Sequence, residues 1–261
     1  MTRITAALAG CSLAAFVTLL PSPFPAAAEG PMAVTKPQIA LAAPLGIEPG
    51  TTKKIVLRGW NLAGAERAEI VGSTVEVKIV SKGGAQVPNR LDAKRIGDEQ
   101  VELEFTAPAE FSGDALPLVI HTPQGASPPH EVLLGGSLPY IVEAEPNDGF
   151  AKPQQIELPR CVEARFERER DVDVYRFSAP AGATFHAETI AAARNSAADT
   201  ILSIYSTAGE LLAVNDDSEN SSDSRLQVSL PTGGEYLVVV QEAHDLGGGA
   251  HPYRLLLRLA P

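Results

Sequence analysis

Short stretches in which apolar and polar residues alternate run through most of this chain of 261 residues. In the N-terminal part they cover residues 55–58, 75–80 and 101–105, and an apolar stretch follows at 116–120. A period of two is typical of a strand with one buried face, and no helical period competes with it. Gly, Pro and Asp divide these stretches at intervals of roughly ten to twenty residues, which indicates an antiparallel β-sandwich.

The C-terminal part shows the same alternation more clearly. Its clearest strands are predicted at residues 172–177, 184–190, 201–205, 226–230, 236–241 and 253–259. The strand at 226–230 has one apolar and one polar face, whereas 236–240 is nearly all apolar and is predicted to be central in its sheet. The side chains expected in the core are Tyr175, Phe177, Tyr205, Tyr236 and Val238. The chain is therefore predicted to be all-β, with two antiparallel β-sandwiches in tandem.

The N-terminus has the pattern of an export signal. Arg3 precedes an apolar run at residues 4–20, and three alanines ending at Ala28 supply the small residues that a signal peptidase needs. The run is marginal for spanning a bilayer, so cleavage after Ala28 predicts an exported protein, periplasmic or extracellular, without a membrane span. An alternative is a lipobox at residues 8–11 with lipoprotein anchoring at Cys11, although seven residues between Arg3 and Cys11 are few for such a signal.

Proline and glycine are dense between Pro128 and Glu143, where one set of predicted strands ends and the other begins. Such a tract is a poor source of ladder hydrogen bonds and of side-chain packing, so we interpret it as a boundary. The predicted division is a signal peptide at residues 1–28, a tether at 29–37, a first sandwich at 38–135, a linker at 136–142 and a second sandwich at 143–261.

The net charge of the chain bears on its possible partners. The chain has 21 basic and 32 acidic residues and a formal net charge of -11, which becomes -12 when Arg3 is lost with the signal peptide. Phosphate backbones would be repelled, so nucleic acid is not expected as a partner.

Cleavage would leave Cys161 as the only cysteine, which excludes an intrachain disulfide. We interpret Cys161 as a small buried residue rather than as a nucleophile.

The sequence lacks the standard catalytic motifs in their usual contexts. We find no Gly-x-Ser-x-Gly, no His-Glu-x-x-His, no Cys-x-x-Cys and no phosphate-binding glycine loop before a helix. The five histidines are scattered along the chain, mostly beside turns. We therefore predict that the protein is not an enzyme, although β-sandwich folds do host hydrolases.

Oxygen-bearing side chains on two short stretches form the best candidate site. A residue before proline is extended, so Glu145 and Glu143 are expected to point to the same side. The second stretch begins a predicted strand, whose start carries Asp171 and Asp173 on one face. The side chains expected to converge are those of Glu143, Glu145, Asn147, Asp148, Asp171 and Asp173. Such donors, with no nitrogen or sulfur among them, suit Ca²⁺, and the alternative is a solvated acidic turn.

These two stretches also carry a resemblance to a known family. The spacing Glu-x-Glu-Pro-Asn-Asp, then about twenty residues, then Asp-x-Asp-Val-Tyr-Arg-Phe resembles the opening of the bacterial pre-peptidase C-terminal (PPC) domain. The resemblance continues at residues 199–205, 212–217, 230–236 and 253–255. It implies a compact antiparallel β-sandwich that accompanies secreted proteins and is not itself catalytic. Collagen-binding members of the wider group hold calcium where an acidic segment meets the domain, so the resemblance implies a calcium site here.

The first sandwich has a second resemblance, made of shorter motifs. Residues 44–50, 57–62 and 121–127 look like landmarks of the IPT/TIG immunoglobulin-like domain. This resemblance implies an immunoglobulin-type sandwich for residues 38–135. Trp60, the only tryptophan, follows Gly59 at a strand end, and we interpret it as a structural aromatic residue rather than as a ligand platform.

A further acidic stretch, residues 215–223, lies between two predicted strands. We interpret it as a turn in which side-chain oxygens accept hydrogen bonds from backbone N–H groups. The PPC resemblance suggests a structural role for Asn215, Asp216 and Asp217. An ion site in this loop is the alternative.

The function predicted from these observations is that of an exported, non-catalytic binding or accessory protein, stabilised by Ca²⁺. Its expected partner is an extracellular protein or polysaccharide. The alternative is a maturation or targeting attachment for a separate secreted peptidase or other hydrolase, since PPC domains commonly follow peptidases. A small hydrolase is the third alternative.

Overall fold

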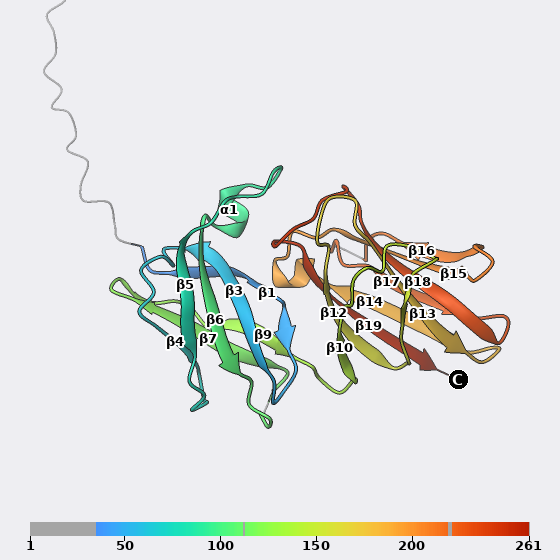
Figure 1. Cartoon of the computed structure of the whole chain (residues 1–261), viewed down its shortest axis with the longest axis horizontal. Coiled ribbons are helices and arrows are strands. Elements are labelled where there is room, and N and C mark those ends of the chain that lie inside the picture. Colours follow the sequence, from blue (N-terminus) through green and yellow to red (C-terminus); the bar gives the residue numbers. More distant parts are fainter. Residues whose placement is uncertain (1–34, 112, 219–220, 261) are drawn as a thin grey trace, which may run out of the picture. The chain divides into compact units, whose positions relative to one another are not determined.

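The computed structural model describes residues 35–111, 113–218 and 221–260, and the regular elements of these residues are almost all β-strands. The predicted signal peptide and residues 29–34 of the predicted tether lie outside the described residues. Within the described residues, no helix is long and apolar enough to cross a membrane. Figure 1 shows strands β1 to β9 in blue to green and strands β10 to β19 in yellow to red.

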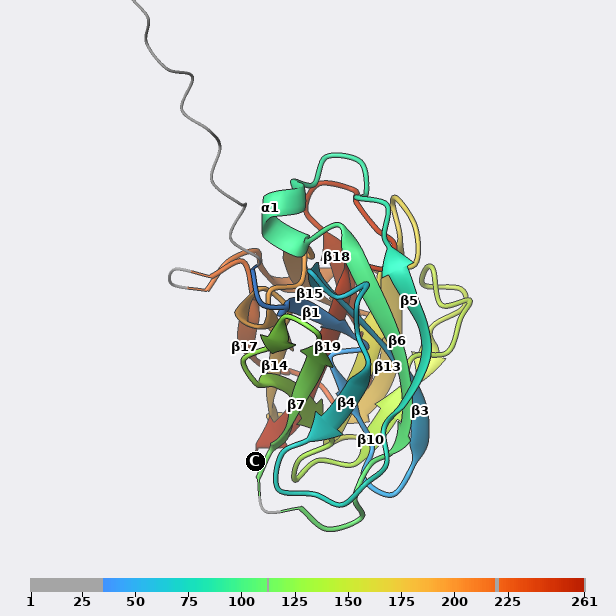
Figure 2. The ribbon, with the colours of Figure 1, turned by 90° about the vertical axis from the view of Figure 1, so that its left-hand side faces the viewer.

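Two sheets pack face to face in the first sandwich. One has the order β1 (Gln38–Ala43), β3 (Thr52–Trp60), β6 (Glu99–Thr106), β5 (Lys78–Gly84). The other has the order β2 (Gly46–Ile47), β9 (His130–Leu134), β7 (Ala115–Thr122), β4 (Arg67–Ile70), with β8 (Gly125–Ala126) paired to β7. Figure 2 shows β5 and β6 side by side in one layer and β4 and β7 in the other. A short helix, α1 (Ala93–Ile96), precedes β6.

The predicted alternation places the core of the first sandwich correctly. Ile55 and Leu57 of β3 and Leu103 of β6 have no exposed surface, whereas Lys54 and Glu102 on the opposite phase form an ion pair at 3.1 Å. The strand predicted at residues 75–80 lies further along the chain in the structure, where β5 begins at Lys78.

The second sandwich also has two sheets. One has the order β10 (Tyr140–Val142), β12 (Arg160–Arg165), β19 (Pro252–Ala260), β14 (Thr184–Ile190), β17 (Arg225–Ser229). The other has the order β11 (Gln154–Gln155), β13 (Val172–Ala179), β18 (Gly234–Glu242), β15 (Thr200–Ser206), β16 (Leu211–Asn215). The pairs β10–β12 and β11–β13 are parallel and the others are antiparallel. A short 3₁₀ helix, η1 (Ala192–Arg194), follows β14. The all-β prediction of two antiparallel sandwiches in tandem is confirmed.

Four of the five side chains predicted for the core of the second sandwich lie in it. Tyr175, Phe177, Tyr236 and Val238 are at most 3% exposed and belong to one cluster of apolar residues. The prediction for Tyr205 is wrong: its side chain is only partly buried and packs against the outer face of the sheet, in edge contact with the ring of Phe150. The opposite phase of β15, which carries Leu202 and Ile204, faces the core.

Contacts also join the two sandwiches. Arg254 of β19 pairs with Glu163 of β12 at 2.9 Å, and both side chains are buried. Glu163 accepts a hydrogen bond from the backbone N–H of Gly46, and Arg254 donates to the backbone oxygen of Leu134 at 2.7 Å. Leu41, Leu45, Ile96 and Leu133 form an apolar cluster with Ala197 and Ala250 at the same junction.

The segment predicted to be a linker is more ordered than expected. Residues 136–142 contain β10, which pairs in parallel with β12, and Glu143 continues this pairing through a backbone hydrogen bond to Glu163. Tyr140, Ile141 and Val142 are good strand formers, which explains how a strand forms directly after a stretch rich in Gly and Pro. The division of the chain into domains stays a prediction.

Candidate metal centre

Residues 143–148 cross from one sheet of the second sandwich to the other. The backbone N–H of Glu143 donates to Glu163 of β12, and the backbone oxygen of Asn147 accepts from Val174 of β13 at 3.1 Å. These two hydrogen bonds hold the backbone of the segment over the start of β13. The strand β13 carries Asp173 into the same region, one residue before Val174.

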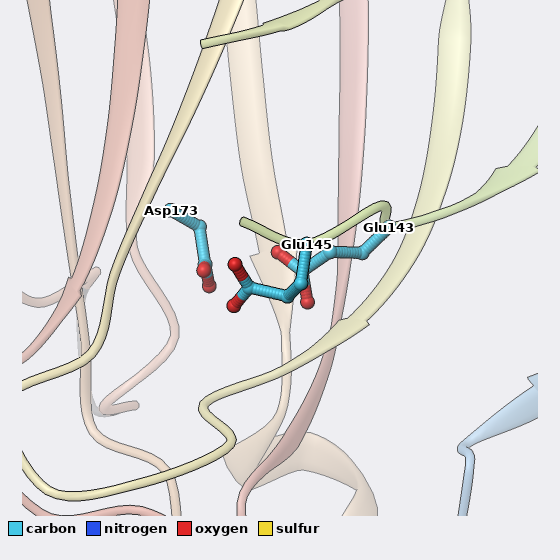
Figure 3. A group of neighbouring side chains, drawn as sticks. All are labelled: Glu143, Glu145 and Asp173. Atoms are coloured by element: carbon cyan, nitrogen blue, oxygen red, sulfur yellow. The ribbon is translucent and has the colours of Figure 1, made fainter. Parts of the chain in front are cut away.

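Glu143, Glu145 and Asp173 point toward one another, as Figure 3 shows. One carboxylate oxygen from each lies within 4.8 Å of those of the other two. A second group shares Glu145 and adds Asp148 and Asp171 within the same distance. The structure thus brings together all five carboxylates of the predicted site in two overlapping groups. The sixth residue, Asn147, is fully buried and donates from its amide to Glu143 Oε1 at 3.0 Å.

Two tyrosine hydroxyl groups donate hydrogen bonds to the first carboxylate group from the core side. Tyr253 donates to Asp173 Oδ2 at 2.6 Å, and Tyr175 donates to Glu143 Oε1 at 2.8 Å. The two hydroxyl oxygens are 3.0 Å apart. The sequence analysis missed this role, because it identified both tyrosines only by strand phase and family resemblance, neither of which gives the direction of a hydroxyl group.

Four buried oxygen atoms in the centre have no hydrogen-bond partner among the described residues: Glu145 Oε1, Asn147 Oδ1, Asp171 Oδ1 and Asp173 Oδ1. Leaving a buried acceptor unsatisfied costs about 1 to 3 kcal/mol, and more for a charged group, so native structures rarely tolerate several together. All four come from different residues of the predicted site. Unsatisfied carboxylate and amide oxygens in one place are the donor set that Ca²⁺ takes.

Burial makes these carboxyl groups reluctant to ionise. Burial, followed by repulsion from Glu143, raises the pKa of Asp173 to about 10. Burial also raises the pKa of Asp171 and of Glu145. Asp173 therefore holds a proton at neutral pH unless a cation replaces it, and Asp171 and Glu145 ionise less readily than exposed carboxyl groups. A groove of about 430 Å³ is lined in part by Glu143 and Glu145.

The acidic stretch at residues 215–223 has a different structure. Asp216 and Asp217 are exposed and approach Asp199, a third group of carboxylates. Asp223 is buried and accepts hydrogen bonds from the backbone N–H groups of Ala191, Ala192 and Ala193 at 2.7, 2.8 and 2.9 Å. This part of the stretch is therefore a cap for η1, as expected of side-chain oxygens that bond to backbone N–H groups.

Residues 171–242 match the family model of the bacterial pre-peptidase C-terminal domain. The predicted PPC domain is thus confirmed for this range, which includes Asp171 and Asp173 but not residues 143–148. A comparison with curated proteins finds no match to this chain.

Solved structures give weak similarities. The pre-peptidase C-terminal domain of Bacillus anthracis collagenase is 13% identical, with a TM-score of 0.33, over 41% of this chain and 94% of that one. PliG of Aeromonas hydrophila, a periplasmic inhibitor of g-type lysozyme, is 15% identical, with a TM-score of 0.30, over 41% and 96%. SGBP-B from a xyloglucan utilization locus of Bacteroides uniformis is 11% identical, with a TM-score of 0.29, over 86% and 72%. Similarities at this level carry no argument about function.

Proposed function

We propose that this chain is an exported, non-catalytic binding or accessory protein whose second sandwich binds Ca²⁺ through Glu143, Glu145, Asn147, Asp148, Asp171 and Asp173. The observation that carries the proposal is the convergence of four buried oxygen atoms without hydrogen-bond partners in the described residues. The match of residues 171–242 to the PPC family supports the non-catalytic role. The partner that we propose is an extracellular protein or polysaccharide.

The proposal includes the domain division. We assign residues 38–135 to an immunoglobulin-like domain of the IPT/TIG type, residues 136–142 to a linker and residues 143–261 to the PPC-type domain. We also propose that residues 1–28 are removed on export. The motifs at residues 44–50, 57–62 and 121–127 support the first assignment, together with the observed sandwich.

The role that we propose for the ion is to hold residues 143–148 on the second sandwich. Two carboxylates about 4 Å apart repel by roughly 4 kcal/mol at an effective dielectric constant near 20, so ionised carboxylates in two overlapping groups would push the segment away from β13. A divalent cation reverses this effect, because it attracts carboxylates from the segment and from β13 at once.

A calcium titration by calorimetry tests the proposal. The natural chain is expected to bind Ca²⁺ with a dissociation constant of about 10⁻⁴ to 10⁻³ M, the range of extracellular modules. Asp171→Asn with Asp173→Asn should abolish the binding, since both residues contribute a buried oxygen without a hydrogen-bond partner among the described residues.

The matched control is Asp216→Asn with Asp217→Asn. It removes the same charge from the exposed group of carboxylates and should leave the binding unchanged. If the natural chain gave no heat of binding at millimolar calcium, or if the control lost it equally, the proposed ion site would be wrong.

A further inference from the structure

Arg168 already places a positive charge on the second carboxylate group, Glu145–Asp148–Asp171. Its guanidinium group forms an ion pair with Asp148 and lies 3.5 Å from Asp171 Oδ1. These two carboxylates and Glu145 raise the pKa of Arg168. The first group, Glu143–Glu145–Asp173, differs, because no lysine or arginine side chain forms an ion pair with it among the described residues.

The backbone that carries Arg168 is packed against a neighbouring segment, while its side chain is more than half exposed. A Cβ atom at Gly247 would lie 2.0 Å from the backbone oxygen of Arg168, so the two chain segments touch at this point. The backbone N–H of Arg170 donates to the backbone oxygen of Asp245 at 3.2 Å, and the backbone N–H of Glu167 donates to Asp171 Oδ2 at 2.5 Å. The Arg168 side chain itself is 56% exposed. The loop thus holds the base of Arg168 beside the carboxylates, within reach of its guanidinium group.

The environment of Asp171 independently indicates that this second group suits a cation. Its side chain is fully buried, and Oδ1 has no hydrogen-bond partner among the described residues. The guanidinium group at 3.5 Å is too far for a good hydrogen bond, so it supplies charge without satisfying this oxygen. A divalent ion would supply positive charge and would also coordinate this oxygen. A guanidinium group that stays in place would repel such an ion.

We propose that Arg168 is the resident cation of the group Glu145–Asp148–Asp171, so that the centre formed by the six residues binds one Ca²⁺ ion, nearest to Glu143, Glu145 and Asp173, and not two. This inference rests on the proposed function, because it presupposes the first ion. Arg168 thereby sets the number of ions that the two overlapping groups hold. Removing its charge should open the second position.

The test is equilibrium dialysis of the full chain against several millimolar CaCl₂ at pH 7.5, followed by measurement of bound calcium per chain. We expect one ion for the natural chain and two for Arg168→Gln. Arg168→Lys, which keeps the charge, should stay closer to one ion than to two. Because the Arg168 side chain is exposed, neither substitution should disturb folding, and circular dichroism of each variant checks this.

Arg165→Gln is the matched control. It removes the same charge from the same loop region, but Arg165 pairs with Glu167 at 3.2 Å and touches Glu143 only through its backbone N–H, which the substitution keeps. This control should bind one ion. Two ions in the natural chain, or one ion in both the natural chain and Arg168→Gln, would overturn the inference while leaving the first site intact. No bound ion in the natural chain would instead overturn the proposed function.

Discussion

Replacing Arg254 by methionine should lower the free energy of unfolding by about 3 to 5 kcal/mol, because it leaves Glu163 buried without its countercharge. Arg254 is 5% exposed and Glu163 is 2% exposed, and their side chains meet at 2.9 and 3.0 Å. Burial raises the pKa of Glu163 even with Arg254 beside it, and the loss of Arg254 would raise this pKa further. Chemical denaturation of the natural chain and the variant measures the difference.

Two further variants separate the buried charge from other losses. Glu163→Gln combined with Arg254→Met removes both charges and keeps an oxygen that accepts from the Gly46 N–H, so it should be more stable than Arg254→Met alone. Arg165→Met breaks an exposed pair and should cost about 0 to 1 kcal/mol. If Arg254→Met cost no more than Arg165→Met, the contact between the two sandwiches would contribute little to stability.

The second large effect is expected at Phe177. This ring has no exposed surface and stacks on Phe185, with centroids 4.6 Å apart, and on Tyr236 at 6.0 Å. Phe177→Ala removes these contacts and leaves a cavity, which costs about 3 to 5 kcal/mol in packed cores. For a chain of this size that corresponds to a melting temperature lower by about 6 to 20 °C.

Phe150 provides the control for Phe177. It is 41% exposed and makes an edge contact with Tyr205 at 5.0 Å, so Phe150→Ala should cost clearly less. Thermal unfolding of both variants gives the comparison. Equal losses at the two positions would contradict the assignment of Phe177 to the core.

The buried face of a strand could be predicted from the sequence where only one of its two faces carries apolar residues. In β13, Asp173 is fully buried on the inner face, so a polar side chain does not by itself mark the exposed face, but Tyr175 and Phe177 identify the inner one. In β15 both phases carry apolar or aromatic residues, so a period of two could not decide between Ile204 and Tyr205. The wrong prediction for Tyr205 follows from this ambiguity.

Features that depend on distant residues could not be predicted. The strand β10 is only three residues long, too short to show a period. The pair Glu163–Arg254 joins positions 91 residues apart, and nothing in either local sequence indicates the partner. The hydrogen bonds that fix this pair to Gly46 and Leu134 depend on the docking of the two sandwiches.

The candidate site was predictable in its carboxylates but not in its surroundings. The alternation around Glu143 and Glu145, and that around Asp171 and Asp173, follows from local geometry. Their convergence was expected from this alternation, and the resemblance of the ordered motifs to a known family added to that expectation. The sequence gives no indication of how far each oxygen is buried or that Arg168 reaches the second group, since both depend on loop packing.

The central claim, that a cation satisfies the buried carboxylates, predicts a particular dependence of stability on pH. The pKa of Asp173 is raised to about 10 in the folded chain, against about 3.9 when unfolded. The folded chain without an ion therefore holds protons that the unfolded chain releases, and its stability falls as pH rises between these two values. Calcium binds the deprotonated carboxylates, so its stabilising effect should grow over the same range.

Thermal unfolding of the natural chain between pH 5.5 and 8, in 10 mM CaCl₂ and in chelator, tests this claim most directly. At pH 8, calcium at about 10 to 100 times its dissociation constant should stabilise the fold by about 1.4 to 2.7 kcal/mol, or raise the melting temperature by about 3 to 10 °C. The difference should shrink toward pH 5.5 and vanish in Asp171→Asn with Asp173→Asn. Equal melting temperatures in calcium and in chelator at every pH would contradict the account.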